Sequence, residues 1–119
     1  MQRIIGIFIV MMLTLTVGTS AVFADSILIS TSSDNHTFSR KWDGTPIKKN
    51  HSTLCYGFNT SFINEDYAYA DSYGYGHRSK IKNANGLHYG PKKWANEGYS
   101  DVEVRHKGSK IYYYCMNIT

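Results

Sequence analysis

The sequence lacks the short motifs that mark most enzyme families. It contains no nucleophile elbow, no phosphate-binding glycine loop and no dinucleotide fingerprint. Its histidines are scattered, and none has the HExxH, HxH or Cys/His spacing that would place metal ligands on one face. They are His36, His51, His77, His88 and His106. We therefore predict that the protein is not an enzyme and holds no metal ion or other cofactor.

One catalytic arrangement stays open as an alternative. If His77 lies on a strand, it could meet Asp71 or Glu103 across a sheet and form an acid–base pair. A histidine on the polar face of a strand is more often simply solvated. A hydrolase acting on the cell envelope is therefore the weakest of the functional hypotheses.

Long runs of like charge are also missing. No block exceeds a pair such as Lys48-Lys49 or Lys92-Lys93, although the chain has 13 basic and 9 acidic residues and a net charge of +4. This mild excess favours approach to an anionic cell envelope by long-range attraction. It is too small to indicate nucleic-acid binding.

The one long apolar run, residues 4–13, is short for the roughly 20 residues that span a bilayer. Arg3 precedes it, and Val22-Phe23-Ala24 offers the small residues that signal peptidase prefers. The alternative is a transmembrane anchor, but strongly polar sequence follows soon after. We predict a signal peptide over residues 1–24, with one secreted (extracellular) domain over residues 25–119.

Cysteine is scarce: the chain has only Cys55 and Cys115. An even pair in a short exported chain predicts a disulfide. A loop of about 60 residues closed in this way would contribute roughly 4 kcal/mol. The alternative is a catalytic thiol.

Helical periodicity is absent, and alternation takes its place. In residues 53–62, Leu54, Tyr56, Phe58 and Phe62 would share one face of a strand. Residues 67–75 place a row of tyrosines opposite mostly small residues. Residues 77–83 predict a strand with Ser79 inward and basic residues outward, ending in a turn at residues 83–86.

Residues 101–105 and 110–116 predict a C-terminal β-hairpin, with its turn at residues 106–109 and Gly108 supplying a positive φ. We expect a long polar loop over residues 35–50 and a loop or one helical turn over residues 91–98. Several short strands without a useful amphipathic helix predict an all-β fold. The expected form is a small antiparallel β-sandwich or barrel with one disulfide.

Aromatic residues are abundant for so small a domain, with two tryptophans and ten tyrosines. Aromatic rings beside glycine can form a platform for sugars or lie at a membrane interface. The alternative is that tyrosine simply fills a small sheet protein, because strands favour it. The candidate binding surface comprises Trp42, Tyr73, Tyr75, Trp94 and Tyr99.

The second half of the chain contains a series of short segments with a characteristic spacing: YADSY at 69–73, GHRSKIKN at 76–83, the glycines at 86 and 90, WA at 94–95, GYSDVEV at 98–104 and YYY at 112–114. This series resembles the secreted bacteriocins of the lactococcin 972 type. The resemblance implies an exported β-sandwich that kills related Gram-positive bacteria. Its implied target is an envelope component such as the cell-wall precursor lipid II. A dedicated immunity protein and an ABC transporter would be expected as partners.

The favoured hypothesis is thus a secreted antibacterial protein that acts on the envelope of related Gram-positive bacteria. The main alternative, motivated by the surplus of tryptophan and tyrosine, is a non-toxic surface or carbohydrate-binding module.

Overall fold

The computed structural model describes residues 25–119, so the predicted signal peptide lies outside the described residues. The chain in this range is all-β, as predicted from its alternation. Its strands are β1 (Ser26–Ser32), β2 (Trp42–Asp43), β3 (Ile47–Lys49), β4 (Ser52–Asn59), β5 (Glu65–Ser72), β6 (His77–Asn83), β7 (Gly86–Tyr89), β8 (Ser100–Arg105) and β9 (Tyr112–Asn117).

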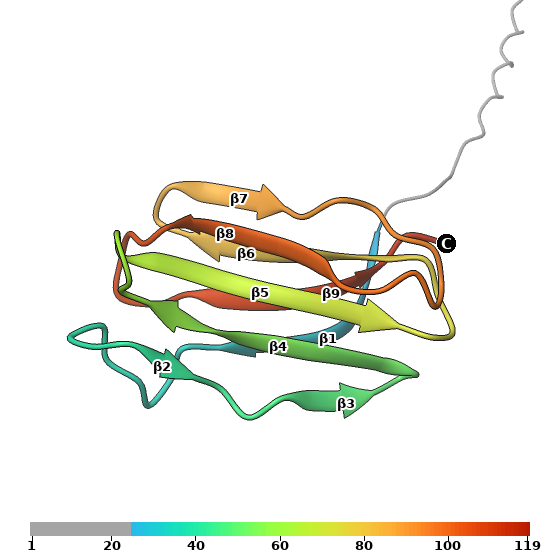
Figure 1. Ribbon diagram of the computed structural model, residues 1–119, viewed down its shortest axis with the longest axis horizontal. Helices are drawn as coiled ribbons and strands as arrows, with labels where there is room; N and C mark the ends of the chain where they lie inside the picture. The colour runs from blue at the N-terminus through green and yellow to red at the C-terminus, as the bar shows by residue number, and fades with distance from the viewer. Residues whose placement is uncertain (1–24) are drawn as a thin grey trace, which may run out of the picture.

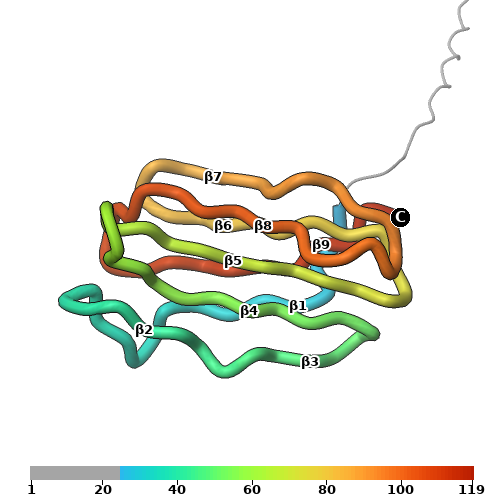
Figure 2. The backbone as a smooth tube through the Cα atoms, viewed as in Figure 1, coloured from blue at the N-terminus to red at the C-terminus, as the bar shows by residue number. Residues whose placement is uncertain are grey.

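The strands form two antiparallel sheets that pack face to face as a β-sandwich (Figure 1). The first sheet has the order β1-β9-β6-β7. The second has the order β2-β4-β5-β8, and β3 pairs with the other half of β4. The chain crosses between the sheets several times, which Figure 2 allows the reader to follow from β5 to β6 and from β7 to β8. The sandwich form of the prediction is therefore confirmed.

The core lies between the inward faces of the two sheets. Strand β4 contributes Leu54 and Phe58, and β9 contributes Tyr113, all of them fully or almost fully buried. Beside β4 in the same sheet, β5 presents only alanines and short polar side chains inward, namely Asp66, Ala68, Ala70 and Ser72. Small residues on one strand thus make room for large ones on the facing sheet, which keeps the interior close-packed.

The tyrosine row of β5 lies on the outer face of the second sheet, because the small residues take the inner face. The hydroxyl groups of Tyr67 and Tyr69 donate to Asp43 and Glu103, respectively. The pattern also predicted Phe62 on the inner face of β4, and this is wrong. Strand β4 ends at Asn59, and the Phe62 side chain is fully exposed in the connection to β5.

The predicted turn at residues 83–86 is confirmed, and β6 and β7 pair across it as a hairpin. The predicted C-terminal hairpin is wrong. Both of its strands exist, but β8 pairs with β5 in the second sheet, and β9 lies between β1 and β6 in the first. Gly108 has the expected positive φ of 102°, in a connection that crosses from one sheet to the other.

The predicted disulfide is also wrong, because Cys55 and Cys115 are both free. Cys55 alternates with the buried Leu54 and Tyr56, so its side chain faces outward from the second sheet. Cys115 points into the core from the first sheet and is fully buried. The two thiols therefore lie on opposite sides of the second sheet, Cys55 on its outer face and Cys115 in the core.

The two predicted loops have different outcomes. Residues 91–98 contain no helix, and Lys93 forms a β-bridge with His77. Residues 35–50 are more ordered than a polar loop, since they contain β2 and β3. Phe38 and Trp42 hold this segment to the core.

Candidate functional site

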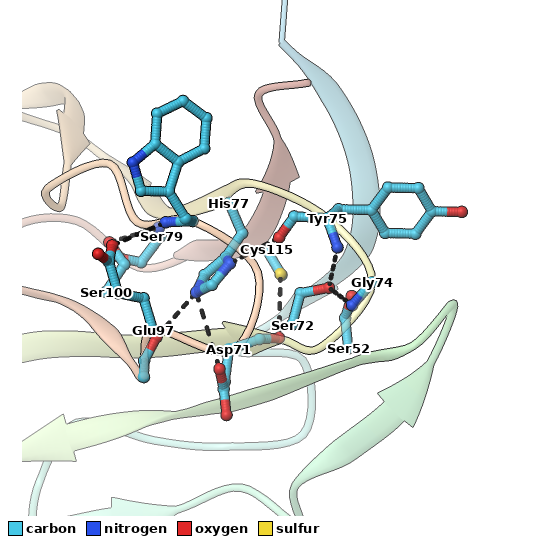
Figure 3. A network of polar contacts seen from close by, with 12 residues as sticks. Ser52, Asp71, Ser72, Gly74, Tyr75, His77, Ser79, Glu97, Ser100 and Cys115 are labelled. Atoms are coloured by element: carbon cyan, nitrogen blue, oxygen red, sulfur yellow. Dashed lines mark hydrogen bonds and ion pairs between the residues drawn. The ribbon is translucent and has the colours of Figure 1, made fainter.

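His77, the candidate acid–base residue, is fully buried at the start of β6. Its Nδ1 lies 3.0 Å from the carbonyl oxygen of Tyr75, and its Nε2 lies 2.8 Å from that of Gly98. Asp71 is near, with 3.8 Å between its Oδ1 and Nε2 of His77 (Figure 3). Glu103 instead accepts a hydrogen bond from the hydroxyl of Tyr69. The His77 ring therefore joins the β5–β6 turn to the β7–β8 connection, which is a structural role.

Four of the five predicted binding residues lie on two connections at one end of the sandwich. Tyr73 and Tyr75 belong to the β5–β6 turn, and Trp94 and Tyr99 to the β7–β8 connection. The backbone N–H of Asn96 donates to the carbonyl of Ser72 over 2.9 Å, which ties the two connections together.

Exposure differs among these four aromatic residues. Trp94 and Tyr73 are 69% and 66% exposed, and Tyr99 is 46% exposed. Tyr75 instead packs against the core. Burial and the nearby Cys55 raise the pKa of the Tyr99 hydroxyl. This end of the sandwich thus offers exposed rings, but no single flat platform of five.

Trp42, the fifth predicted residue, lies on β2, whose partner Phe58 is at the far end of β4 from Ser52 and the β5–β6 turn. His36 stacks on its ring at 3.8 Å between centroids, while Tyr56 and Tyr113 pack edge-on against it. Trp42 is therefore chiefly a packing residue, which agrees with the alternative interpretation of the aromatic surplus.

A more regular arrangement lies on the outer face of the first sheet, where basic and tyrosine side chains alternate. On β6, Lys80 stands between Tyr114 of β9 and Tyr89 of β7 in the register of the sheet. Lys82 pairs in the same way with Tyr112 of β9. We call this surface the cationic tyrosine face; its members are Arg78, Lys80, Lys82, Lys110, Tyr89, Tyr112 and Tyr114.

Every tyrosine ring of this face has a basic group over it. Arg78 lies 4.2 Å from the centroid of Tyr89, and Lys80 lies 4.9 Å from that of Tyr114. Lys82 and Lys110 both approach Tyr112, at 5.8 and 5.4 Å. Such cation–π contacts contribute roughly 0.5–1 kcal/mol each at exposed sites. They hold the long side chains extended along the sheet.

Carboxylates meet this face only at its two ends. Asp25 forms an ion pair with Arg78 at 2.6 Å, and Asp34 forms one with Lys110 at 3.2 Å. The hydrogen bond to Lys110 lowers the pKa of Asp34 and raises that of Lys110. Within residues 25–119, neither Lys80 nor Lys82 lies within ion-pair distance of a carboxylate. The centre of the face is therefore uncompensated positive charge.

The outer face of the second sheet has the opposite character. It carries five of the nine acidic residues of the chain, namely Asp43, Glu65, Asp71, Asp101 and Glu103. A hydrogen bond to Glu103, together with burial, raises the pKa of Tyr69 to about 12. The two outer faces of the sandwich (Figure 1) thus differ in sign, which would orient the protein with its first sheet toward an anionic surface.

A hollow of ≈ 320 Å³ continues the cationic tyrosine face beyond the end of β6. Lys82, Lys110 and Tyr112 line it together with residues 83–84 and 108–109. Lys82 and Lys110 therefore line a recess that is large enough for a small anionic group.

Sequence reasoning placed the basic residues of β6 outward but did not find this face. The missing step was the pairing of β6 with β9, because residues 110–116 were assigned to a hairpin with residues 101–105. A usable signal was present, since Tyr112 and Tyr114 alternate on one side of their strand just as Lys80 and Lys82 do.

No family model, curated protein or solved structure matches this chain. Within the described residues, no group of three or more histidine, cysteine or acidic side chains is placed to hold a metal ion. No helix in the same range is long and apolar enough to cross a membrane.

Proposed function

We propose that the protein is a secreted antibacterial protein that acts on the cell envelope of related Gram-positive bacteria. In this proposal, the cationic tyrosine face binds an anionic envelope component, and binding rather than catalysis is the basis of the effect. The predicted signal peptide and the resemblance to bacteriocins of the lactococcin 972 type support export and target. A dedicated immunity protein and an ABC transporter belong to the same proposal.

The observation that carries the proposal is the uncompensated charge at the centre of this face. Lys80 and Lys82 stand on neighbouring outward positions of one strand, each beside a tyrosine ring. Ordered ammonium groups on a flat surface suit phosphate groups, which lysine binds as a point charge. Phosphate is present in lipid II, in anionic lipids and in anionic wall polymers.

A paired set of variants tests the proposal. The double variant Lys80→Gln/Lys82→Gln removes two charges from the cationic tyrosine face. The control Lys48→Gln/Lys49→Gln removes two from exposed positions of β3 in the other sheet. The purified protein, the variant and the control are spotted on lawns of a broad panel of Gram-positive bacteria.

We expect inhibition zones for the wild type and the control, and none or much smaller ones for the Lys80/Lys82 variant. The absence of any zone across the panel would count against antibacterial action. Equal zones for the variant and the control would remove the cationic tyrosine face from the mechanism.

A second candidate is the non-toxic carbohydrate-binding module. The specific observation in its favour is the exposure of Tyr73, Trp94 and Tyr99 at one end of the sandwich. Binding to a glycan array or to peptidoglycan that Trp94→Ala abolishes, without growth inhibition by the wild type, would support this candidate instead.

A further inference from the structure

We infer that the ligand of the cationic tyrosine face is a linear polymer of phosphodiesters joined by short polyols, which lies along β6. The inference rests on the proposed function, because it names the ligand class of the same face. Four features support it: the spacing of the basic groups, the state of the tyrosine rings, the distribution of exposed apolar residues, and the hollow at the end of the row.

The basic groups are spaced by the geometry of one strand. Arg78, Lys80 and Lys82 occupy successive outward positions of β6, and alternate residues of a strand are about 6.7 Å apart. Phosphodiesters that are linked by a three-carbon polyol repeat over a similar distance when the chain is extended. A ligand of this type can place one phosphate at each basic residue without leaving the strand.

The tyrosine rings argue against a single-stranded nucleic acid. Nucleic-acid-binding sheets stack bases on open aromatic faces. Here the rings of Tyr89, Tyr112 and Tyr114 already have basic groups over them. Bases would have to displace these groups, whereas a polyol phosphate has no ring to stack and needs only the charges.

The distribution of apolar residues argues against insertion into a lipid surface. The exposed apolar side chains along this outer face are Leu87, beside Lys82 on edge strand β7, and Ile27, on the opposite edge strand β1. Strands β6 and β9 separate them, so they form no continuous patch. The face is suited to an anionic chain that lies on it, with no part that would enter the acyl region.

The hollow gives the row a defined end. Beyond Lys82, a further phosphate would enter the recess that Lys82, Lys110 and Tyr112 line. Lys110 would then release Asp34, its exposed ion-pair partner, and bind the phosphate of the ligand instead. At the other end of the row, a phosphate at Arg78 would take the place of Asp25 in its ion pair. The face thus has places for about four phosphates, at Arg78, Lys80, Lys82 and the hollow.

Calorimetric titration of the purified protein with synthetic oligo(glycerol phosphate) of one to six units tests the inference. We expect affinity to rise steeply with each unit up to about four and only slightly thereafter. A matched oligomer with the same number of phosphodiesters, joined by ten-carbon diols, should bind at least about tenfold more weakly, because it cannot keep the strand spacing.

Variants locate the polymer on the face. Lys82→Gln should weaken binding about three- to tenfold and reduce the slope of log affinity against log salt by about 0.7. Lys48→Gln, on β3, should change neither. Oligothymidylate and vesicles of phosphatidylglycerol with phosphatidylcholine serve as competing ligands.

Equal affinity for the two spacings, or tighter binding to oligothymidylate or to the vesicles, would overturn the inference. Either result is distinguishable from failure of the proposed function. If the Lys80/Lys82 variant lost its inhibition zones but the protein bound both oligomer spacings equally, the proposed function would hold and only the inference about the polymer would fail.

Discussion

Replacing each cysteine separately should have very different effects on stability. Cys115 is fully buried in the core, and its Sγ lies 3.9 Å from the carbonyl oxygen of Asp71. Cys115→Ala removes this atom and leaves a small cavity, which we expect to cost about 1–2 kcal/mol. For a domain of this size, such a loss lowers Tm by roughly 5–15 °C. Cys55→Ala, at a half-buried outward position, should stay within about 0.5 kcal/mol of the wild type.

Urea denaturation of the two single variants and the double variant measures these effects. With two free thiols in different layers, the two losses of unfolding free energy should be nearly additive. A disulfide would give another result: each single variant would lose about 4 kcal/mol, and the double variant would lose little more.

Thiol labelling supplies a second measurement on the same protein. Burial raises the pKa of the Cys115 thiol to about 11, so it should resist alkylation near neutral pH until the protein unfolds. Labelling of both thiols in the unfolded wild type without reductant would agree with the structure. Two equally destabilised single variants and an unlabelled wild type would refute the reasoning.

Three further results are expected. The pKa of the Tyr69 hydroxyl is raised to about 12 in the folded protein, from 10 in the unfolded chain. Its hydrogen bond therefore stabilises the fold fully below pH 10, and this stabilisation is lost as the pH rises toward 12. In urea denaturation, Tyr69→Phe should remove the part of the alkaline decrease in stability that Tyr69 causes. His106→Ala should cost about 3 kcal/mol by the same assay, because Nδ1 of His106 lies 2.8 Å from the fully buried carboxylate of Asp66. Gly90→Ala should cost about 1–3 kcal/mol in thermal unfolding, since a Cβ there would lie 2.8 Å from the Asp101 carbonyl oxygen.

Alternation was sufficient to predict β4, β5, β6, β8 and β9, but not the short strands β2 and β3 and not all of the strand partners. The inward Ser79 and Ile81 of β6, and the turn after it, follow from local pattern and turn chemistry. The strands at residues 100–105 and 112–117 were also predictable. Each would have one buried face in a hairpin and equally in opposite sheets, so alternation does not distinguish these two arrangements. Their short separation in the sequence favoured the hairpin, but in the structure β9 pairs with β1 and β6, which are distant in the sequence.

The disulfide shows a different limit. Its prediction depended on compartment and on the even number of cysteines, not on geometry. The pattern that placed Leu54 and Tyr56 on one face already put Cys55 on the other. Applying that alternation to the cysteine would have predicted a thiol directed away from the core.

The candidate site depended on this same missing pairing. The outward basic residues of β6 are readable from the sequence, but their alternation with Tyr112 and Tyr114 exists only because β9 lies beside β6. Of the five aromatic residues that composition highlighted, Trp42 and Tyr75 pack against the core, whereas Tyr73, Trp94 and Tyr99 are exposed at one end of the sandwich.

Binding to purified cell walls of a sensitive strain, measured across a range of salt concentrations, tests the central claim most directly. The account predicts that Lys80→Gln/Lys82→Gln weakens binding strongly at low salt and reduces the salt slope by about 1.4, whereas Lys48→Gln/Lys49→Gln leaves both near the wild-type values. Equal losses in the two double variants, or wall binding that does not depend on salt, would contradict it.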